Sequence, residues 1–216
     1  MPYVYPESFA SQKVNLDKTN DMIRIFSEMY GPYPYSKEKC GHAQCGFGGG
    51  MEHQTISSMG GFSESLAAHE LAHQWFGNKV TCKDWQNIRL NEGFATYSDK
   101  LYHQKKYGDA AFNNQMNSVM TSSKTANGTI YVQNINSVGE IFNSARSYNK
   151  GAAVLHMLRG IIGNEKIFQV LGEYLIEPGL SYNVATTEDF QRVAERVSGQ
   201  NLYERQITMV LKSTKN

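Results

Sequence analysis

The spacing of apolar and polar residues predicts short extended segments near the start of the chain and helices after them. Residues 3–5, between two prolines, are expected to form a strand. A helix is expected over residues 17–30, with apolar side chains on one face and Gly31 at its end. Residues 40–58 alternate between apolar and polar positions around a run of glycines. They predict two extended segments joined by a glycine-rich connection.

From residue 63 onward the pattern is helical. Ser63 or Ser65 can cap a helix that continues to about Phe76 and ends at Gly77. Further helices are expected over residues 92–107, 109–121, 148–162, 165–177 and 187–198, with a short strand over 79–81 and an irregular polar stretch over 122–146. Strands followed by helices predict the α+β class, with a sheet lobe packed on a helical lobe.

Composition and charge exclude several classes of protein. The chain has 216 residues, of which 40% are hydrophobic and 19% charged, as in a folded globular domain. A formal net charge of +1 provides no field that would attract nucleic acid. No run approaches the roughly 20 apolar residues of a membrane span. Cys40 and Cys45 are compatible with a disulfide or with reduced thiols, and Cys82 would remain unpaired in either case.

The segment His69-Glu70-Leu71-Ala72-His73 carries the strongest chemical signal. In a helix, residues four apart share one face and lie about 6 Å apart along the axis, so both imidazoles can bind one metal ion. Glu70 lies beside them without being a ligand and can accept a proton from water at that metal. The segment therefore predicts a zinc-dependent hydrolase.

A catalytic zinc ion usually has three protein ligands and one open position, so a third ligand is expected. The best candidate is Glu92, in the segment Asn-Glu-Gly-Phe-Ala at the expected start of the next helix. An antiparallel helix after a short connection would bring its carboxylate beside the two imidazoles. The helix dipole alone would also explain a carboxylate at this place. The combination with the two histidines favours a metal ligand.

Together these segments resemble one known family, the zinc aminopeptidases related to aminopeptidase N and leukotriene hydrolase. In that family HExxH is followed, after eighteen residues, by the Glu of an NEGFA-like segment. Here eighteen residues separate His73 from Glu92, and residues 91–95 are NEGFA. Three further family segments have counterparts: GxMEN as GGMEH at 49–53, tyrosine-x-KGA at 148–152, and FGPYP as YGPYPY at 30–35. The resemblance extends over nearly the whole chain.

The resemblance implies a role for each residue of the metal site. His69, His73 and Glu92 would hold one Zn²⁺ per chain, and Glu70 would act as general base and then as general acid. The hydroxyl of Tyr148 would stabilise the oxyanion opposite the metal.

The resemblance also implies how substrate is held. Glu52 would pair with the free α-ammonium group of a peptide, which excludes internal peptide segments. Gly49, Gly50 and Met51 would run along the substrate, with the glycines permitting close backbone approach. His53 stands where the family usually has Asn, so the polar contacts around Glu52 are expected to differ.

The implied fold is a thermolysin-like catalytic domain over residues 1–216, with a small sheet lobe over about 1–62 and a helical lobe over about 63–216. The N-terminal β domain and the C-terminal helical domain of the family are absent from this chain, which predicts a longer parent protein. The expected function is an aminopeptidase. The alternatives are a related zinc hydrolase with endopeptidase or epoxide hydrolase activity, and a non-catalytic scaffold on the same fold. The variant GGMEHQT resembles bacterial members, which favours a bacterial, extracytoplasmic origin over a cytoplasmic one.

Overall fold

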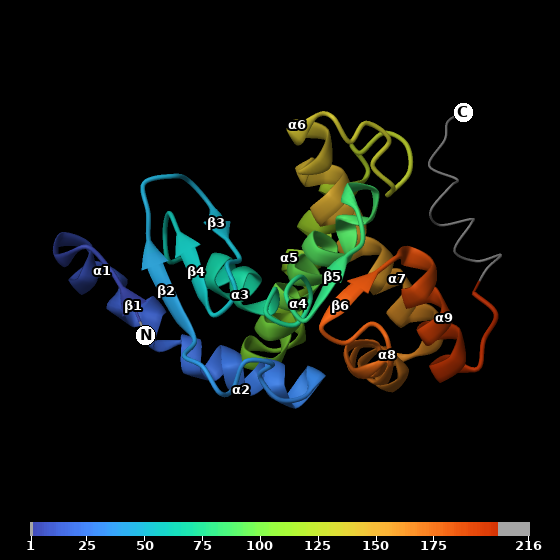
Figure 1. Ribbon diagram of the computed structural model, residues 1–216, viewed down its shortest axis with the longest axis horizontal. Helices are drawn as coiled ribbons and strands as arrows, with labels where there is room; N and C mark the ends of the chain where they lie inside the picture. Colours follow the sequence, from blue (N-terminus) through green and yellow to red (C-terminus); the bar gives the residue numbers. More distant parts are fainter. Residues whose placement is uncertain (1, 203–216) are drawn as a thin grey trace.

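A computed structural model describes residues 2–202, and in it a four-stranded sheet and a larger group of helices lie on either side of helix α3 (Figure 1). Residue 1 and residues 203–216, which belong to the expected domain over 1–216, lie outside the described residues. The mixture of a small sheet with many helices confirms the predicted α+β class.

The first part of the chain forms the sheet and the helices beside it. Its elements are β1 (Pro2–Tyr3), α1 (Pro6–Asp17), α2 (Thr19–Tyr30), β2 (Gly41–Gln44), β3 (Gly50–Met51), β4 (Ile56–Met59) and α3 (Glu64–Ala72). The strand order is β1-β2-β4-β3, in which β1, β2 and β4 are parallel and β3 is antiparallel to β4. Strand β3 therefore lies at one edge of this sheet, next to α3.

The rest of the described chain is mostly helical. Its elements are β5 (Val80–Cys82), the 3-10 helix η1 (Trp85–Asn87), α4 (Arg89–Tyr107), α5 (Asp109–Ser123), α6 (Val138–Ile141), the π-helix η2 (Ser144–Lys150), α7 (Gly151–Ile162), α8 (Asn164–Ile176), β6 (Asn183–Ala185) and α9 (Thr187–Ser198). Helix α4 packs against α3, α5 and α7 and is the central element of this group. Within the described residues, no helix is both long and apolar enough to cross a bilayer.

A single large apolar core connects the two parts. Trp75, at the end of the segment that carries the histidines, is fully buried and contacts the rings of Phe26 and Tyr30 from α2. Phe94 of α4 contacts Phe76 on one side and Phe190 of α9 on the other. Burial of such aromatic side chains stabilises the fold by roughly 1.5–3 kcal/mol each. The core therefore fixes α3 and α4 between the sheet and the later helices.

The sequence did not predict helix α1. Helix α1 follows β1 directly, whereas the helix expected over residues 17–30 is present as α2. Pro6 and Glu7 lie in the first turn of α1, and both residue types are typical of the start of a helix. Its side chains are mostly exposed and only Leu16 is buried, so no apolar periodicity reveals the helix. The glycine-rich region forms three short strands, β2, β3 and β4, instead of two.

Several expected boundaries also differ. Helix α3 ends at Ala72 and not near Phe76, because the amides of Asn78, Lys79 and Val80 turn back to bond the carbonyls of His73, Gln74 and Trp75. Helix α4 begins at Arg89, before Glu92, because η1 leads directly into it and Asp84 caps η1. The helix expected from residue 148 is preceded by the π-helix η2. Strand β6, which was not expected, pairs in parallel with β5, about a hundred residues earlier.

Candidate metal centre and active site

Helix α3 and the turn after it position the two histidines. His69 lies in the last turn of α3, and His73 is the residue that ends the helix. The Nδ1 of His73 lies 3.0 Å from the carbonyl oxygen of Phe76, and since a carbonyl only accepts, this nitrogen carries the proton. The Nε2 of His73 is therefore the ring nitrogen available to a metal ion, and it faces His69, 3.1 Å from its Nε2.

Helix α4 brings the third candidate ligand to the same point. The Oε2 of Glu92 lies 3.3 Å from Nε2 of His69 and 3.4 Å from Nε2 of His73. With zinc bonds of about 2.0–2.1 Å, two ligand atoms of a tetrahedral site are separated by about 3.3 Å. The three measured separations match that value. Within the described residues, these side chains therefore form a donor set that fits zinc in chemistry and in spacing.

The charge distribution at this point also favours a cation. Burial raises the pKa of Glu92, but the neighbouring His73 and His69 outweigh it and lower the pKa to about 2. Glu92 is therefore ionised and only 3% exposed. A buried carboxylate that faces two imidazoles requires positive charge between them, either as protons or as a metal ion.

Glu70 lies next to this set and points into the same space. Its side chain is buried, and its Oε2 has no hydrogen-bond partner among the described residues. Burial raises the pKa of Glu70, and the charges of Glu52 and Glu92 add to that effect against the opposing histidines. A buried carboxylate oxygen without a partner is costly unless a ligand or water completes it. Glu70 is thus placed to accept a hydrogen bond or a proton from a group inside the cleft.

The glycine-rich strand β3 closes over Glu70. A Cβ atom added to Gly50 would lie 2.3 Å from Oε1 of Glu70 and 2.4 Å from its Cδ, so any larger residue here would require the Glu70 side chain to move. Asn78 donates to the carbonyl of Glu52 at 2.9 Å, and Gln74 accepts from the amide of Thr55 at 2.9 Å. Two residues of the turn after His73 therefore hold the segment that follows β3 and carries Glu52.

Tyr148 reaches the metal site from the π-helix η2. Its ring stacks on the ring of His69, with centroids 5.9 Å apart and planes at 21°. Burial raises the pKa of Tyr148, and the charges of Glu92 and Glu52 raise it further, so its hydroxyl keeps its proton and remains a donor. A π-helical turn widens the helix, and such turns are frequent at functional sites.

A close crossing of two helices sets the position of this tyrosine. A Cβ atom on Gly93 would lie 2.7 Å from the Cα of Gly151, and one on Gly151 would lie 2.8 Å from the Cα of Gly93. Gly93 directly follows Glu92, and Gly151 begins α7 just after η2. Backbone contact between α4 and α7 thus brings Glu92 and Tyr148 to the same cavity.

These side chains share one cavity of about 530 Å³. Its lining includes all but one of the ten residues that the sequence singled out, together with Gly48, Leu66 and Phe142. The exception is His53, whose Nδ1 lies 3.1 Å from Oγ of Ser58, the residue that pairs with Met51 across the sheet edge. The sequence analysis did not single out Phe142, because this residue lies in the stretch expected to be an irregular polar loop. The pair of adjacent apolar residues Ile141 and Phe142 could have marked a buried position there.

A second cavity of about 560 Å³ adjoins the first. The two share Met51, Glu52 and Phe142, and the second is lined further by Trp85 and Ile88. The side chain of Glu52 therefore stands between the metal-site cavity and a largely apolar one.

The structure also answers a question about the cysteines that the sequence alone left open. No disulfide joins Cys40 to Cys45, both of which the structure describes.

The matching family model and the similar relatives all indicate the same protein family. The model of the Peptidase family M1 domain matches residues 14–210. Aminopeptidase M1-C of Oryza sativa subsp. japonica is 37% identical over 154 residues, which are 67% of this chain and 17% of that protein. Endoplasmic reticulum aminopeptidase 2 of Homo sapiens is 36% identical over 137 residues, which are 57% of this chain and 13% of that protein. The chain thus spans less than a fifth of the length of these relatives.

Solved structures show the same fold. An M1 zinc metallopeptidase from Deinococcus radiodurans superimposes with a TM-score of 0.78 at 27% sequence identity, covering 92% of this chain and 45% of that one. A mutant form of that metallopeptidase has been solved with a Tyr-Ser-Ala substrate. The family and these neighbours imply a zinc cofactor. The chain belongs to peptidase family M1, of which it contains the catalytic-domain region.

Proposed function

We propose that this chain is the catalytic domain of a zinc aminopeptidase, which removes N-terminal residues from peptides by attack of water on the first peptide bond. One observation carries the proposal: the ligand atoms of His69, His73 and Glu92 converge in a cavity that also contains Glu70 and Glu52. Such a set offers a metal, a base and an anchor for an amine in one space.

The two histidines and Glu92 would hold the zinc ion through one atom each. When bound, zinc polarises the carbonyl of the scissile bond and makes water more acidic. Glu70 takes the proton from the attacking water and delivers it to the nitrogen of the leaving amine, so that its carboxylate is regenerated after each turnover. Its unpartnered Oε2 supports this role.

Tyr148 would donate its hydroxyl proton in a hydrogen bond to the oxygen on which negative charge develops. Its raised pKa keeps the proton in place, and its stacking on His69 fixes the ring. A donor held in place before the reaction needs no rearrangement when charge forms, which lowers the barrier.

Glu52 would bind the α-ammonium group of the substrate. It lies within reach of Glu70 and His73, since one ligand atom of each falls within 4.8 Å of the others. A peptide whose amine pairs with Glu52 therefore presents its first peptide bond, and no later one, to Glu70. Gly49, Gly50 and Met51 would lie along that peptide, whereas His53 would act only through the strand.

The domain boundaries are part of the same proposal. We place one thermolysin-like catalytic domain over residues 1–216, with the sheet lobe over about 1–62 and the helical lobe after it, inside a longer parent protein. The short share of the relatives' length that the chain covers supports a longer parent protein.

Two comparisons test the function. The zinc-loaded chain is expected to hydrolyse a peptide with a free N-terminus and to leave the N-acetylated form of the same peptide intact. Glu70→Gln is expected to retain one zinc per chain, measured by mass spectrometry, and to lose turnover. Equal cleavage of the free and acetylated peptides would contradict the aminopeptidase assignment, and full activity of Glu70→Gln would contradict the role of Glu70.

A further inference from the structure

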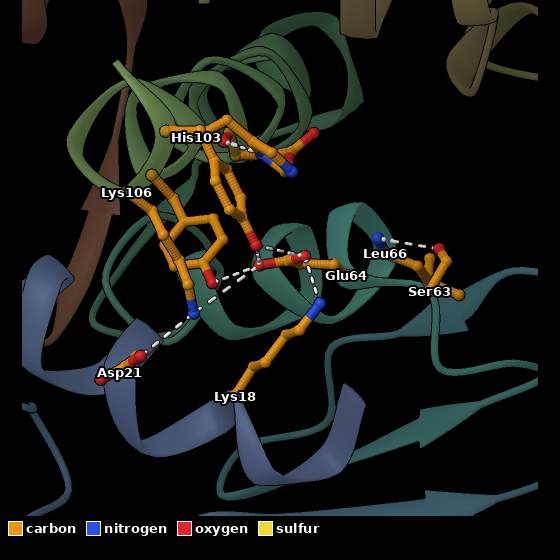
Figure 2. A network of polar contacts seen from close by, with 10 residues as sticks. Lys18, Asp21, Ser63, Glu64, Leu66, His103 and Lys106 are labelled. Atoms are coloured by element: carbon orange, nitrogen blue, oxygen red, sulfur yellow. Dashed lines mark hydrogen bonds and ion pairs between the residues drawn. The ribbon is translucent and has the colours of Figure 1, made fainter. Parts of the chain in front are cut away.

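Outside the metal cavity, Glu64 is the centre of a polar network that joins three helical elements (Figure 2). It is the first residue of α3, five residues before His69, and its side chain is 15% exposed. The Oε1 of Glu64 accepts hydrogen bonds from Tyr102 at 2.6 Å and from Tyr107 at 2.8 Å, both from α4. Its Oε2 accepts from Lys18, at the junction of α1 and α2, at 2.6 Å.

A second cation closes the network. Lys106 of α4 lies 3.9 Å from Oε1 of Glu64 and donates to Asp21 of α2 at 3.0 Å. Burial by itself raises the pKa of Glu64, but hydrogen bonds from Lys18, Tyr102 and other partners outweigh it and lower the pKa to about 2. The carboxylate is therefore ionised and satisfied on both oxygens, which makes the contacts directional and strong.

The apolar face of α3 consists mostly of small side chains. Its buried apolar side chains are Ala67, Ala68, Leu71 and Ala72, of which three end at Cβ. These small side chains let α3 approach α4 closely, and the polar contacts of Glu64 add directional restraints to that packing. Hydrogen bonds have preferred angles, so they restrict the orientation of α3 more narrowly than apolar contact alone.

The network and the metal site lie at opposite ends of α4, so the network affects how α3 is oriented at the metal site. Glu64 meets the last turns of α4, whereas His69 and His73 meet Glu92 in its first turn, so the helices run in opposite directions. Ten residues of α4, about 15 Å, separate Glu92 from Tyr102. Two contact points this far apart define both the rotation and the axial position of one helix against the other.

We propose that Glu64 is a positioning residue of the metal site: through Tyr102 and Tyr107 it sets α3 against α4 and so holds the two histidines opposite Glu92 before the metal arrives. A ligand set held in place loses less conformational entropy when it binds zinc. The effect on catalysis rests on the function proposed above, whereas the effect on zinc affinity does not.

The test measures zinc affinity and kinetics in the chain over 1–216. Glu64→Gln removes the negative charge and keeps the side-chain volume. Tyr107→Phe removes one hydroxyl donor to Glu64 and should disturb the core little, because Tyr107 is 49% exposed. The zinc Kd of Glu64→Gln, obtained by competition with a chelator, is expected to rise about 10-fold, at the lower end of effects known for side chains that directly support ligands. With saturating zinc, kcat is expected to fall while KM changes less than about 2-fold. Tyr107→Phe is expected to shift zinc Kd in the same direction by a smaller factor.

Glu28→Gln is the matched control. Glu28 also pairs with a cation, Arg24 at 2.8 Å, but on the exposed face of α2, and its loss is expected to leave zinc Kd and kcat unchanged. The proposal is refuted if the folded variants of Glu64 and Tyr107 bind zinc as tightly as the unchanged chain, even when their melting temperatures fall. Should Glu64→Gln fail to fold, Tyr107→Phe decides alone. Absence of peptide hydrolysis in the unchanged chain would count against the proposed function and leave the zinc measurement valid.

Discussion

Replacing Gly50 with alanine is expected to slow peptide hydrolysis about 100-fold without removing zinc. The added Cβ would lie 2.3 Å from Oε1 of Glu70 and 2.6 Å from its Cγ, whereas ordinary contacts begin near 3.4 Å. The carboxyl group must therefore withdraw by about 1 Å, and displacement of a reacting group on that scale can cost about two orders of magnitude in rate. That factor corresponds to about 2.7 kcal/mol of transition-state stabilisation. The backbone of Gly50 is not in the left-handed region, so the alanine adds a steric clash without backbone strain.

The assay is steady-state hydrolysis of a fluorogenic peptide with a free N-terminus, together with zinc content by mass spectrometry. Gly46→Ala is the matched control, since Gly46 lies in the same glycine-rich segment and a Cβ there meets nothing within 4 Å. We expect kcat to fall in Gly50→Ala and to stay within about 2-fold in Gly46→Ala, with one zinc per chain in both. A Gly50→Ala enzyme with kcat near that of the unchanged chain would refute the close approach of this strand to Glu70.

Three further outcomes are expected. Tyr148→Phe should lower kcat by about 10²–10³ with zinc retained, because one oxyanion donor is lost, and steady-state kinetics will measure it. Gly93→Ala should destabilise the chain by about 1–3 kcal/mol, since the new methyl meets the backbone of Gly151, and urea unfolding will show whether the midpoint falls. The stability difference between the unchanged chain and Glu64→Gln should be at most about 3 kcal/mol near pH 7. Because the folded pKa of Glu64, about 2, lies below its usual 4.5, that difference should shrink as pH falls from about 5 towards 2, followed by urea unfolding at each pH.

Much of the candidate site was readable in the sequence because its parts are local. Two histidines four residues apart on a helix must share a face, so the spacing of His69 and His73 was enough to pair them. The eighteen-residue spacing to Glu92 and the segments around Glu52 and Tyr148 added the remaining candidates through their resemblance to a family. The structure brings all of these side chains to one cavity.

Some elements carried too little local signal to be predicted. Helix α1 buries only Leu16, so its sequence has no apolar period. Strand β6 has three residues, of which two are exposed, and exists because β5 pairs with it. Phe142 enters the cleft from a stretch whose composition resembles a polar loop. In each case the partner that stabilises the element is distant in sequence, and a propensity based on neighbours cannot register it.

The sequence by itself determined which groups could do chemistry, because residue type and short-range spacing decide which side chains share a helix face. The tertiary structure decided how closely they meet. The contact of Gly50 with Glu70, the backbone crossing of Gly93 with Gly151, and the attachment of Glu64 to the end of α4 all join residues from different elements. Their distances follow from how the whole core packs, since close-packed interiors transmit the position of one helix to the next.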